Sequence, residues 1–429
     1  MPAKKQAGPA RKRTTTGPSD APGAPTTTSS ELDAALDDIH GIHGEGLVVR
    51  GDKMPNANHS PTGVFAVDLG LCGGLAEGFG AMFYGFESSG KTLLALLACA
   101  GYLRKHPDKI AVFVDAEKLY DGAWAAKLGV DTSRLRVITP DTGEQAIDAI
   151  ARMMYVDVVG MVVLDSLPSL VPKAVVDRSA EDKTMGALAA LLGILCSKII
   201  VAWGKERRRG HRVTVINLNQ WRMKVGGFVL GDPRTLPGGR QINHLPTTKI
   251  AMRGKEENEK TDDGDTVSVS TELFFKFDKT KHGKSINAGA WTMVLGGGHE
   301  SGLPPGSVDD AGTVVVYAIK FGLVTGGGGR YRLTAFTEEV FRKKENIIAW
   351  LRANPYEQSL LRATMIAAMR VRHGMKPLPP DNSLEGLRNV HTLIDMQLVQ
   401  RIAATAQDVP TAPAPNTSDE EEGEADEEA

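Results

Sequence analysis

The residues with the clearest chemical signal form one octapeptide, GFESSGKT at positions 85–92. It fits the pattern G-x-x-x-x-G-K-[ST], in which backbone N–H groups surround the phosphates of a nucleotide. The lysine of this pattern reaches the β- and γ-phosphates, and the final hydroxyl binds Mg²⁺. The sequence therefore predicts a nucleotide and Mg²⁺ site at Gly85, Phe86, Glu87, Ser88, Ser89, Gly90, Lys91 and Thr92.

The segments on either side of the octapeptide support this interpretation. Residues 81–84 (AMFY) are typical of a short buried strand, and residues 93–98 (LLALLA) begin an apolar helix. A loop in this place holds an anion at a helix N-terminus, where unpaired N–H donors and the helix dipole favour negative charge. The alternative is a chance glycine-rich turn before a helix, and the strand–loop–helix order argues against it.

Two acids follow apolar runs that resemble further strands. Residues 161–164 (MVVL) lead into Asp165, which we expect to hold Mg²⁺ together with Thr92. Residues 112–114 (VFV) lead to Glu117, the candidate for polarising the water that attacks the terminal phosphate. An acid at a strand end is often a plain surface residue, and only the phosphate loop upstream favours the catalytic interpretation.

The composition is that of an ordinary globular protein, with 41% hydrophobic and 24% charged residues. We find no apolar run of the roughly 20 residues that span a bilayer, and therefore expect no membrane segment. The three cysteines Cys72, Cys99 and Cys196 lack metal-ligand spacing, which predicts buried free thiols in a reducing compartment. Residues 1–30 contain no apolar stretch of a secretory signal, so the expected location is the cytoplasm.

The formal net charge of -2 conceals opposite charges at the two ends of the chain. Five cations precede the first acid, whereas eight of the twelve residues at 418–429 are acidic. Blocks of like charge are typical of disordered interaction tails, although a tail that only solubilises the protein fits as well. We predict disordered tails at residues 1–30 and 410–429.

Between about residues 64 and 300, strand-like apolar runs alternate with amphipathic helices. Runs at 136–138 and 213–217 join those named above, and runs at 273–277 and 288–294 are predicted as a strand pair that completes the sheet. This alternation predicts an α/β fold with a mostly parallel sheet covered by helices. We expect a short N-terminal helix at 30–39 within a segment 31–60, a core at 61–300, and a smaller α+β domain at 301–409.

Several motifs occur along the chain in a fixed order: FESSGKT at 86–92, VDAE at 114–117, KLGVD at 127–131, PDTGEQA at 140–146, and NQ at 219–220 with RMK at 222–224. Together they resemble the RecA recombinases of bacteria and their phage-encoded relatives. The resemblance extends over roughly residues 31 to 355. It implies a RecA-like ATPase core, and an N-terminal segment that packs on the neighbouring subunit.

The resemblance implies roles in ATP binding and hydrolysis at matching positions. Glu117 corresponds to the catalytic glutamate, and Gln220 to a sensor of the γ-phosphate that reorders the adjoining loop. Asp121 and Trp124 fall where the family contacts adenine, with Trp124 in place of a tyrosine; an indole can still stack on a base.

Two lysines, Lys279 and Lys281, match a pair that the family places across the subunit interface against the neighbour's ATP. A cation supplied in this way stabilises charge in the transition state and makes hydrolysis depend on assembly. His244 stands where the family has an apolar interface residue, so local subunit packing is expected to differ. Without the resemblance, two lysines near a strand end are ordinary surface charge.

The segment 221–239 is long and glycine-rich, and it interleaves cations with apolar residues. Cations for phosphates and apolar groups for bases suit single-stranded nucleic acid, although a flexible lid over the nucleotide is an alternative. It resembles the family's second DNA-binding loop, and we expect contacts from Arg222, Met223, Lys224, Phe228, Gly238, Gly239 and Arg240.

Residues 176–186 correspond to the family's first DNA-binding loop. Met185 and Gly186 match the family, whereas an arginine that follows them in the family appears here as Ala190. We expect Arg178 or Lys183 to compensate for the missing cation.

The combined expectation is an ATP- and Mg²⁺-dependent recombination protein that forms helical filaments on single-stranded DNA and pairs that strand with homologous duplex DNA. Single-strand-binding and loading proteins are further expected partners. Two alternatives remain open: a hexameric helicase or translocase of the same fold, and a non-catalytic recombination mediator.

Overall fold

The computed structural model describes residues 29–44, 46–53, 57–176, 186–223, 234–260, 266–283, 285–297, 299–333, 336–376 and 396–405. The chain divides into two compact units, Met1–Pro55 and Asn56–Ala429. The first unit contains helix α1 (Ser29–His43) and the 3-10 helix η1 (Gly51–Lys53), so the expected N-terminal helix is confirmed and is longer than predicted. The predicted disordered tail at residues 1–30 is wrong for Ser29 and Ser30, which begin α1. The rest of that tail and residues 410–429 lie outside the described residues.

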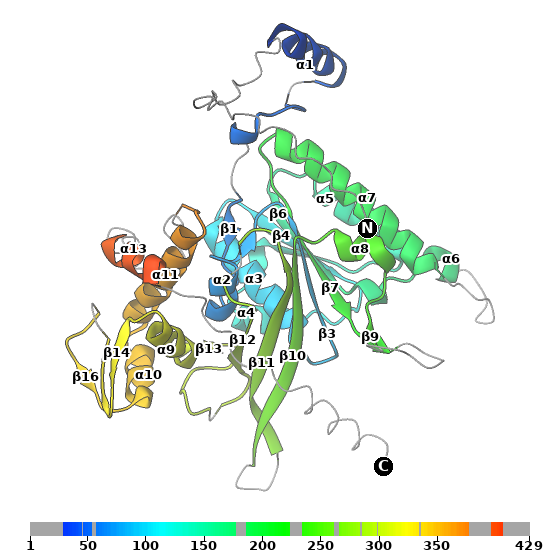
Figure 1. The fold of residues 1–429 in the computed structure, drawn as a ribbon. Helices are drawn as coiled ribbons and strands as arrows, with labels where there is room; N and C mark the ends of the chain where they lie inside the picture. The colour runs from blue at the N-terminus through cyan, green and yellow to red at the C-terminus, as the bar shows by residue number, and fades with distance from the viewer. Residues whose placement is uncertain are drawn as a thin grey trace, which may run out of the picture. The chain divides into compact units, whose positions relative to one another are not determined.

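The second unit is built on a nine-stranded sheet (Figure 1) with the order β13-β12-β11-β10-β3-β7-β6-β4-β5. The six strands from β10 to β5 run parallel, and β11, β12 and β13 are added antiparallel. The predicted, mostly parallel α/β fold is therefore confirmed. The strand bounds are β3 (Gly80–Gly85), β4 (Ile110–Asp115), β5 (Leu135–Ile138), β6 (Val159–Asp165), β7 (Thr214–Gln220), β10 (Thr248–Lys260), β11 (Thr266–Thr280), β12 (Ala288–Val294) and β13 (Val308–Asp309).

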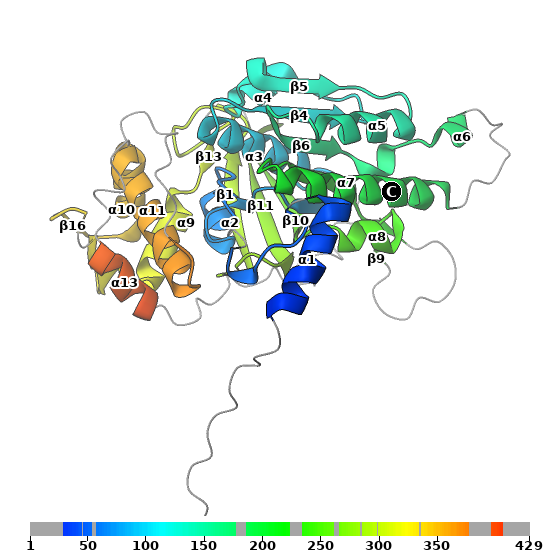
Figure 2. The same ribbon diagram turned by 90° about the horizontal axis from the view of Figure 1, so that it is seen from above.

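Alternate side chains of each central strand enter two different cores. On β3, Phe83 faces the core formed with helices α2 (Phe65–Gly70) and α3 (Lys91–Lys105). Its neighbours Met82 and Tyr84 face the core formed with α5 (Gly143–Met153) and α7 (Ala187–Arg208), which lie side by side (Figure 2). Because successive side chains of a strand point to opposite faces, a run that is apolar throughout requires helices on both sides of the sheet.

One central strand, β10, was not predicted, and β11 is much longer than the predicted run 273–277. The two strands pair over their full lengths, from Thr248 opposite Thr280 to Lys260 opposite Thr266. Their distant halves are rich in charged and hydroxyl residues and extend beyond the strands that flank the hairpin. On β10 the distant residues 254–260 (GKEENEK) include no apolar side chain, so the hydrophobic alternation that reveals a strand is missing there from the sequence.

Helix α7 contradicts the expectation that no segment is long and apolar enough to cross a bilayer. By length and composition Ala187–Arg208 passes that test. Its buried residues Leu192, Leu195, Ile199 and Trp203 recur at helical spacing and join the second core. The apolar run is thus explained by packing against the sheet.

The three cysteines Cys72, Cys99 and Cys196 are buried and free, as expected. The C-terminal part of the second unit combines helices with a three-stranded antiparallel sheet. Its elements are α9 (Ala311–Lys320), β14 (Val324–Gly327), β15 (Arg330–Leu333), β16 (Val340–Phe341), α10 (Lys344–Ala353), α11 (Pro355–Arg372) and α13 (Met396–Thr405). Strands β1 (His59–Ser60) and β2 (Leu75–Ala76) form a small antiparallel pair on either side of α2 in the chain. The 3-10 helix η2 (Thr132–Arg134) is a further outer element.

A buried carboxylate, Asp68 on α2, holds the turn that leads into the core. Its Oδ1 accepts hydrogen bonds from the Thr62 backbone N–H at 2.7 Å and from the Thr62 hydroxyl at 2.8 Å. Burial nevertheless raises the pKa of Asp68 to about 6, because the bonds to Thr62 and the charge of Arg362 only partly offset the lost hydration.

We predict that Asp68→Asn makes the protein less sensitive to pH between about 4 and 6. The native carboxyl keeps its proton up to about pH 6, whereas an unfolded one loses it near 3.8. The wild type therefore loses stability as pH rises through this window, on the order of 2 kcal/mol, and the variant does not. Thermal or urea unfolding of both proteins from pH 4 to 7 measures the difference, with the exposed Asp108→Asn as control. A difference that is constant with pH would contradict the prediction.

Candidate nucleotide and DNA site

The predicted phosphate loop joins β3 to α3, as the sequence indicated. Gly90 is the N-cap of α3 and lies in the left-handed region at φ 79°. A Cβ added at Gly85 would lie 2.2 Å from the Met252 carbonyl oxygen, and one added at Gly254 would lie 2.5 Å from the Ser88 carbonyl oxygen. The loop therefore packs directly on the backbone of β10, and both glycines are required by close approach.

Lys91 is buried at the centre of this loop. Its Nζ donates to the Phe86 carbonyl oxygen at 2.5 Å and to the Ser89 hydroxyl at 3.1 Å. Burial lowers the pKa of the Lys91 amine, while the nearby carboxylates Asp165, Glu117 and Glu87 oppose that shift. The arrangement holds one ammonium group among the N–H groups of the loop, as binding of a polyphosphate requires.

Thr92 and Asp165 meet as predicted, since the Thr92 hydroxyl donates to Asp165 Oδ2 at 2.6 Å. Burial, together with the charges of Glu117 and Asp115, raises the pKa of Asp165 to about 6, although the Thr92 hydrogen bond and the charge of Lys91 oppose the shift. A hydroxyl and a crowded carboxylate are oxygen ligands of the kind that Mg²⁺ prefers. The residues present therefore fit Mg²⁺, whose charge would favour the ionised form of Asp165.

Glu117 lies beside this pair because β4 and β6 end in register, with Asp115 opposite Asp165. The Asp115 carboxylate accepts from the Tyr120 backbone N–H at 2.9 Å and so fixes the turn that carries Glu117. Glu117 Oε1 accepts from the hydroxyls of Ser166 at 2.5 Å and Ser169 at 3.2 Å. Sequence reasoning missed both serines, although they follow Asp165 within four residues.

Asp121 and Trp124, the expected adenine contacts, lie at the start of helix α4 (Gly122–Lys127). The Asp121 carboxylate accepts from the backbone N–H groups of Ala123 at 2.8 Å and Trp124 at 3.1 Å, so it caps this helix. The Trp124 side chain is half-buried against the first core. Both residues thus have structural roles, and their contact with adenine stays a prediction.

Gln220 ends β7 directly opposite Gly85, the first residue of the phosphate loop. The next residue, Trp221, donates its backbone N–H to the Gly85 carbonyl at 3.2 Å and packs edge-on against Tyr84, with ring centroids 5.1 Å apart. The Arg234 guanidinium lies over the Trp221 ring at 5.5 Å. The predicted sensor and the base of the second loop therefore contact the phosphate loop itself.

The second loop begins with β8 (Arg222–Met223), which pairs with β9 (Arg234–Thr235). Arg222 and Met223 are exposed, whereas Lys224 and Phe228 lie outside the described residues. Gly238 caps helix α8 (Gly239–His244) at φ 103°, and Gly239 and Arg240 in its first turn are exposed.

The first and second loops converge at two adjacent helix starts. Gly186 caps α7 at φ 86°, and a Cβ added at Gly239 would lie 3.6 Å from the Ala189 Cβ. Arg178 and Met185, the other expected contacts of the first loop, lie outside the described residues. The structure therefore places the described ends of both loops side by side.

Lys279 and Lys281 are not brought to the phosphate loop of their own chain. Lys279 pairs with Lys249 and donates to the His244 carbonyl oxygen at 2.9 Å. Burial lowers the pKa of Lys279, and the charge of Lys281 lowers it further. Lys249 in turn lies opposite Met82 on β3, three residues before Gly85. Lys279 is therefore two strands away from β3, about 10 Å across the sheet, and about 10 Å from Gly85 along the strand direction.

The family model described as the RecA N-terminal domain matches residues 30–298. The RecA protein of Kineococcus radiotolerans is 34% identical over 335 residues, which cover 77% of this chain and 90% of that protein. The chain belongs to the RecA family. The RecA proteins of Frankia casuarinae (32% identity; 76% of this chain, 88% of that protein) and Streptomyces ambofaciens (30% identity; 92% of this chain, 96% of that protein) are similarly related.

Membership of the RecA family supports a recombination and repair function, with the ATP and DNA binding that this function involves. It also implies the use of a nucleotide and magnesium in general.

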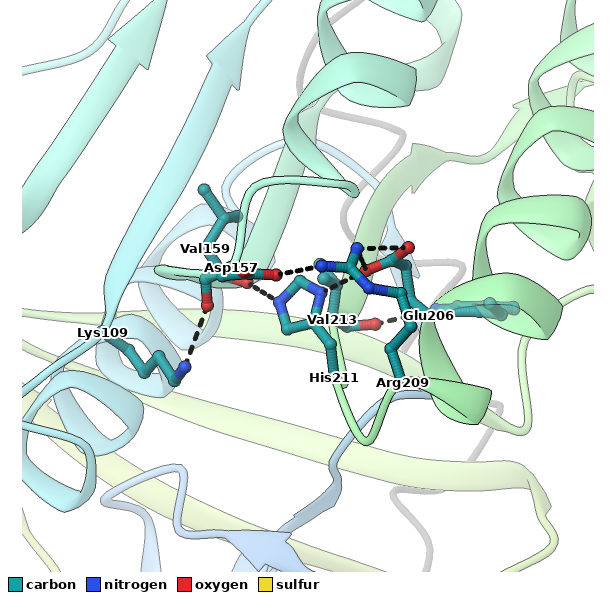
Figure 3. A network of polar contacts seen from close by, with 8 residues as sticks. Lys109, Asp157, Val159, Glu206, Arg209, His211 and Val213 are labelled. Carbon is teal, nitrogen blue, oxygen red and sulfur yellow. Dashed lines mark hydrogen bonds and ion pairs between the residues drawn. The ribbon is translucent and has the colours of Figure 1, made fainter. Parts of the chain in front are cut away.

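A second polar cluster lies at the C-terminal end of α7 (Figure 3). Asp157, Glu206 and His211 approach one another closely enough to share a cation. The Arg209 guanidinium already occupies this place, donating to both oxygens of Glu206 and to Asp157. His211 bonds Glu206 and the Val159 carbonyl, so the cluster ties α7 to β6 and serves a structural purpose.

We predict that Gly254→Ala weakens ATP binding by about tenfold, because the new methyl group displaces the Ser88 carbonyl and with it the phosphate loop. Gly312→Ala is the matched control, since a Cβ there meets only Ile348 Cδ1 at 3.8 Å. Calorimetric titration with ATP and Mg²⁺ measures both affinities. An unchanged Kd for Gly254→Ala would contradict the close packing of the loop on β10.

Proposed function

We propose that this protein is a DNA-dependent ATPase that forms helical filaments on single-stranded DNA and catalyses homologous pairing and strand exchange. The single observation that carries the proposal is the contact between Gln220–Trp221 and Gly85, which joins the DNA-loop base to the phosphate loop. A nucleotide that repositions Gly85 must also act on the start of the second loop.

In the proposed mechanism, the loop N–H groups and Lys91 hold the phosphates, and Thr92 and Asp165 hold Mg²⁺, which neutralises charge on the phosphates. Glu117 accepts a hydrogen bond from the attacking water and orients it. Gln220, at the other side of the loop, is the group proposed to bond the terminal phosphate. Loss of that phosphate would release Gln220 and loosen the loop that grips DNA.

The proposed contacts with DNA from the second loop are made by Arg222, Met223, Gly238, Gly239 and Arg240. Cations at exposed positions bind phosphates without reading sequence, so base pairing between strands is left to identify homology. The proposed set of DNA contacts is completed by Gly186, Arg178, Met185, Lys224 and Phe228. We place this activity in the cytoplasm, with single-strand-binding and loading proteins as further proposed partners.

Assembly is proposed to complete the ATPase site. Lys279 and Lys281 lie too far from their own phosphate loop for a lysine side chain to bridge the gap, so a second subunit is needed to use them. The helicase alternative differs in forming a closed ring, which electron microscopy on single-stranded DNA distinguishes from a filament. The mediator alternative is disfavoured by the presence of Lys91, Glu117 and Asp165 in one site.

We predict that single-stranded DNA strongly stimulates ATP hydrolysis and that Glu117→Gln reduces the stimulated rate by at least about 10²-fold. The amide keeps the size of the carboxylate but is a poor base, so binding of ATP and DNA should persist. Phosphate release and DNA-binding anisotropy measure the two properties on the same samples. Hydrolysis that is indifferent to DNA would reject the coupled mechanism.

A mixing experiment tests the proposed lysines. Glu117→Gln and the double variant Lys279→Ala/Lys281→Ala should each be inactive alone. In a 1:1 mixed filament, roughly a quarter of the interfaces combine an intact Glu117 with an intact lysine pair from the next subunit, so activity should partly return. Mixtures with no more activity than their components would place the lysines outside the neighbour's site.

A further inference from the structure

Two serine hydroxyls converge on the carboxylate proposed to orient the attacking water. Ser166 directly follows Asp165, and Ser169 ends the 3-10 helix η3 (Leu167–Ser169). Their Oγ atoms are 3.0 Å apart, and both lie within hydrogen-bond distance of Glu117 Oε1. The next helix, α6 (Lys173–Val176), begins after this turn.

We propose that Ser169 is a positioning residue for ATP hydrolysis, which acts with Ser166 to hold Glu117 by one carboxylate oxygen. This inference rests on the proposed function, because it requires Glu117 to act on water. It adds a residue that lies outside the phosphate loop and outside both DNA loops.

The proton count defines how Ser169 acts. The two hydroxyls carry two protons for three short contacts. The Ser166 hydroxyl donates its proton in the 2.5 Å hydrogen bond to Glu117 Oε1. The Ser169 hydroxyl therefore divides its single proton between two acceptors, Glu117 Oε1 at 3.2 Å and Ser166 Oγ at 3.0 Å. Either bond strengthens the hold on Glu117, directly or by polarising the Ser166 hydroxyl.

Both contacts fall on Oε1 of Glu117. Among the described residues, no hydrogen bond to the second oxygen, Oε2, is present, so that oxygen can accept from water. The terminal torsion of a glutamate is broad, and a single bond to Ser166 would leave the carboxylate free to swing. A second hydroxyl on the same oxygen limits this rotation and directs Oε2.

The Ser169 side chain is not needed for the turn itself. The turn is closed by the backbone bond from Ser169 N–H to the Ser166 carbonyl at 3.2 Å, which an alanine would keep. Removal of the hydroxyl should therefore change the freedom of Glu117 without unfolding η3.

The test is Ser169→Ala, measured as DNA-stimulated ATP hydrolysis. We expect kcat to fall about fivefold while KM for ATP and the affinity for single-stranded DNA stay within about twofold, since only the orientation of Glu117 is affected. Ser169→Thr, which keeps the hydroxyl, should recover most of the rate. Ser197→Ala is the control, because Ser197 is exposed and bonds only the Gly193 carbonyl of its own helix.

A double-mutant cycle with Glu117→Gln separates this inference from the proposed function. Ser169→Ala should add no further loss to the residual rate of Glu117→Gln, because both changes act on one group. A wild-type or faster rate for Ser169→Ala, a threonine variant as slow as alanine, or additive losses would overturn the role of Ser169. Full activity of Glu117→Gln itself would instead reject the proposed function of Glu117.

Discussion

The parallel register of four strands is the constraint on which the rest of this structure depends. β3, β4, β6 and β7 all end at the same edge of the sheet, with Gly85 opposite Gln220 and Asp115 opposite Asp165. The groups that follow these strands therefore lie close together at this edge of the sheet, although they are far apart in the chain. A slip of one residue in any pair would move its group to the opposite face of the sheet.

Close backbone packing holds this edge together. The phosphate loop lies on β10 at Gly254, where no larger residue fits, so the strand that sequence patterns did not reveal is the one that supports the loop. On the other side, Trp221 packs against Tyr84 and bonds Gly85. The proposed nucleotide and DNA sites are therefore in direct backbone contact, and a coupling between them needs no long pathway.

Electrostatics at the edge favours a divalent cation. The carboxylates of Asp165, Glu117 and Glu87 act on the ammonium of Lys91. The pKa of Asp165 is raised by its burial first, and then by the charges of Glu117 and Asp115. Hydroxyl groups donate hydrogen bonds to two of these carboxylates, from Thr92 to Asp165 and from Ser166 and Ser169 to Glu117. A divalent cation at this edge would therefore offset the repulsion between the carboxylates.

Local patterns in the sequence determined the strand–loop–helix unit, the acids at the strand ends and the α/β class, because burial on both faces of a parallel strand leaves a continuous apolar run. They also identified the family, through short motifs in order. Only the tertiary structure decided that Ser169 meets Glu117, that Gly254 supports the phosphate loop, and that Lys279 lies away from its own phosphate loop. These facts depend on which strands become neighbours and in what register, and that outcome is set by packing between segments that share no local pattern.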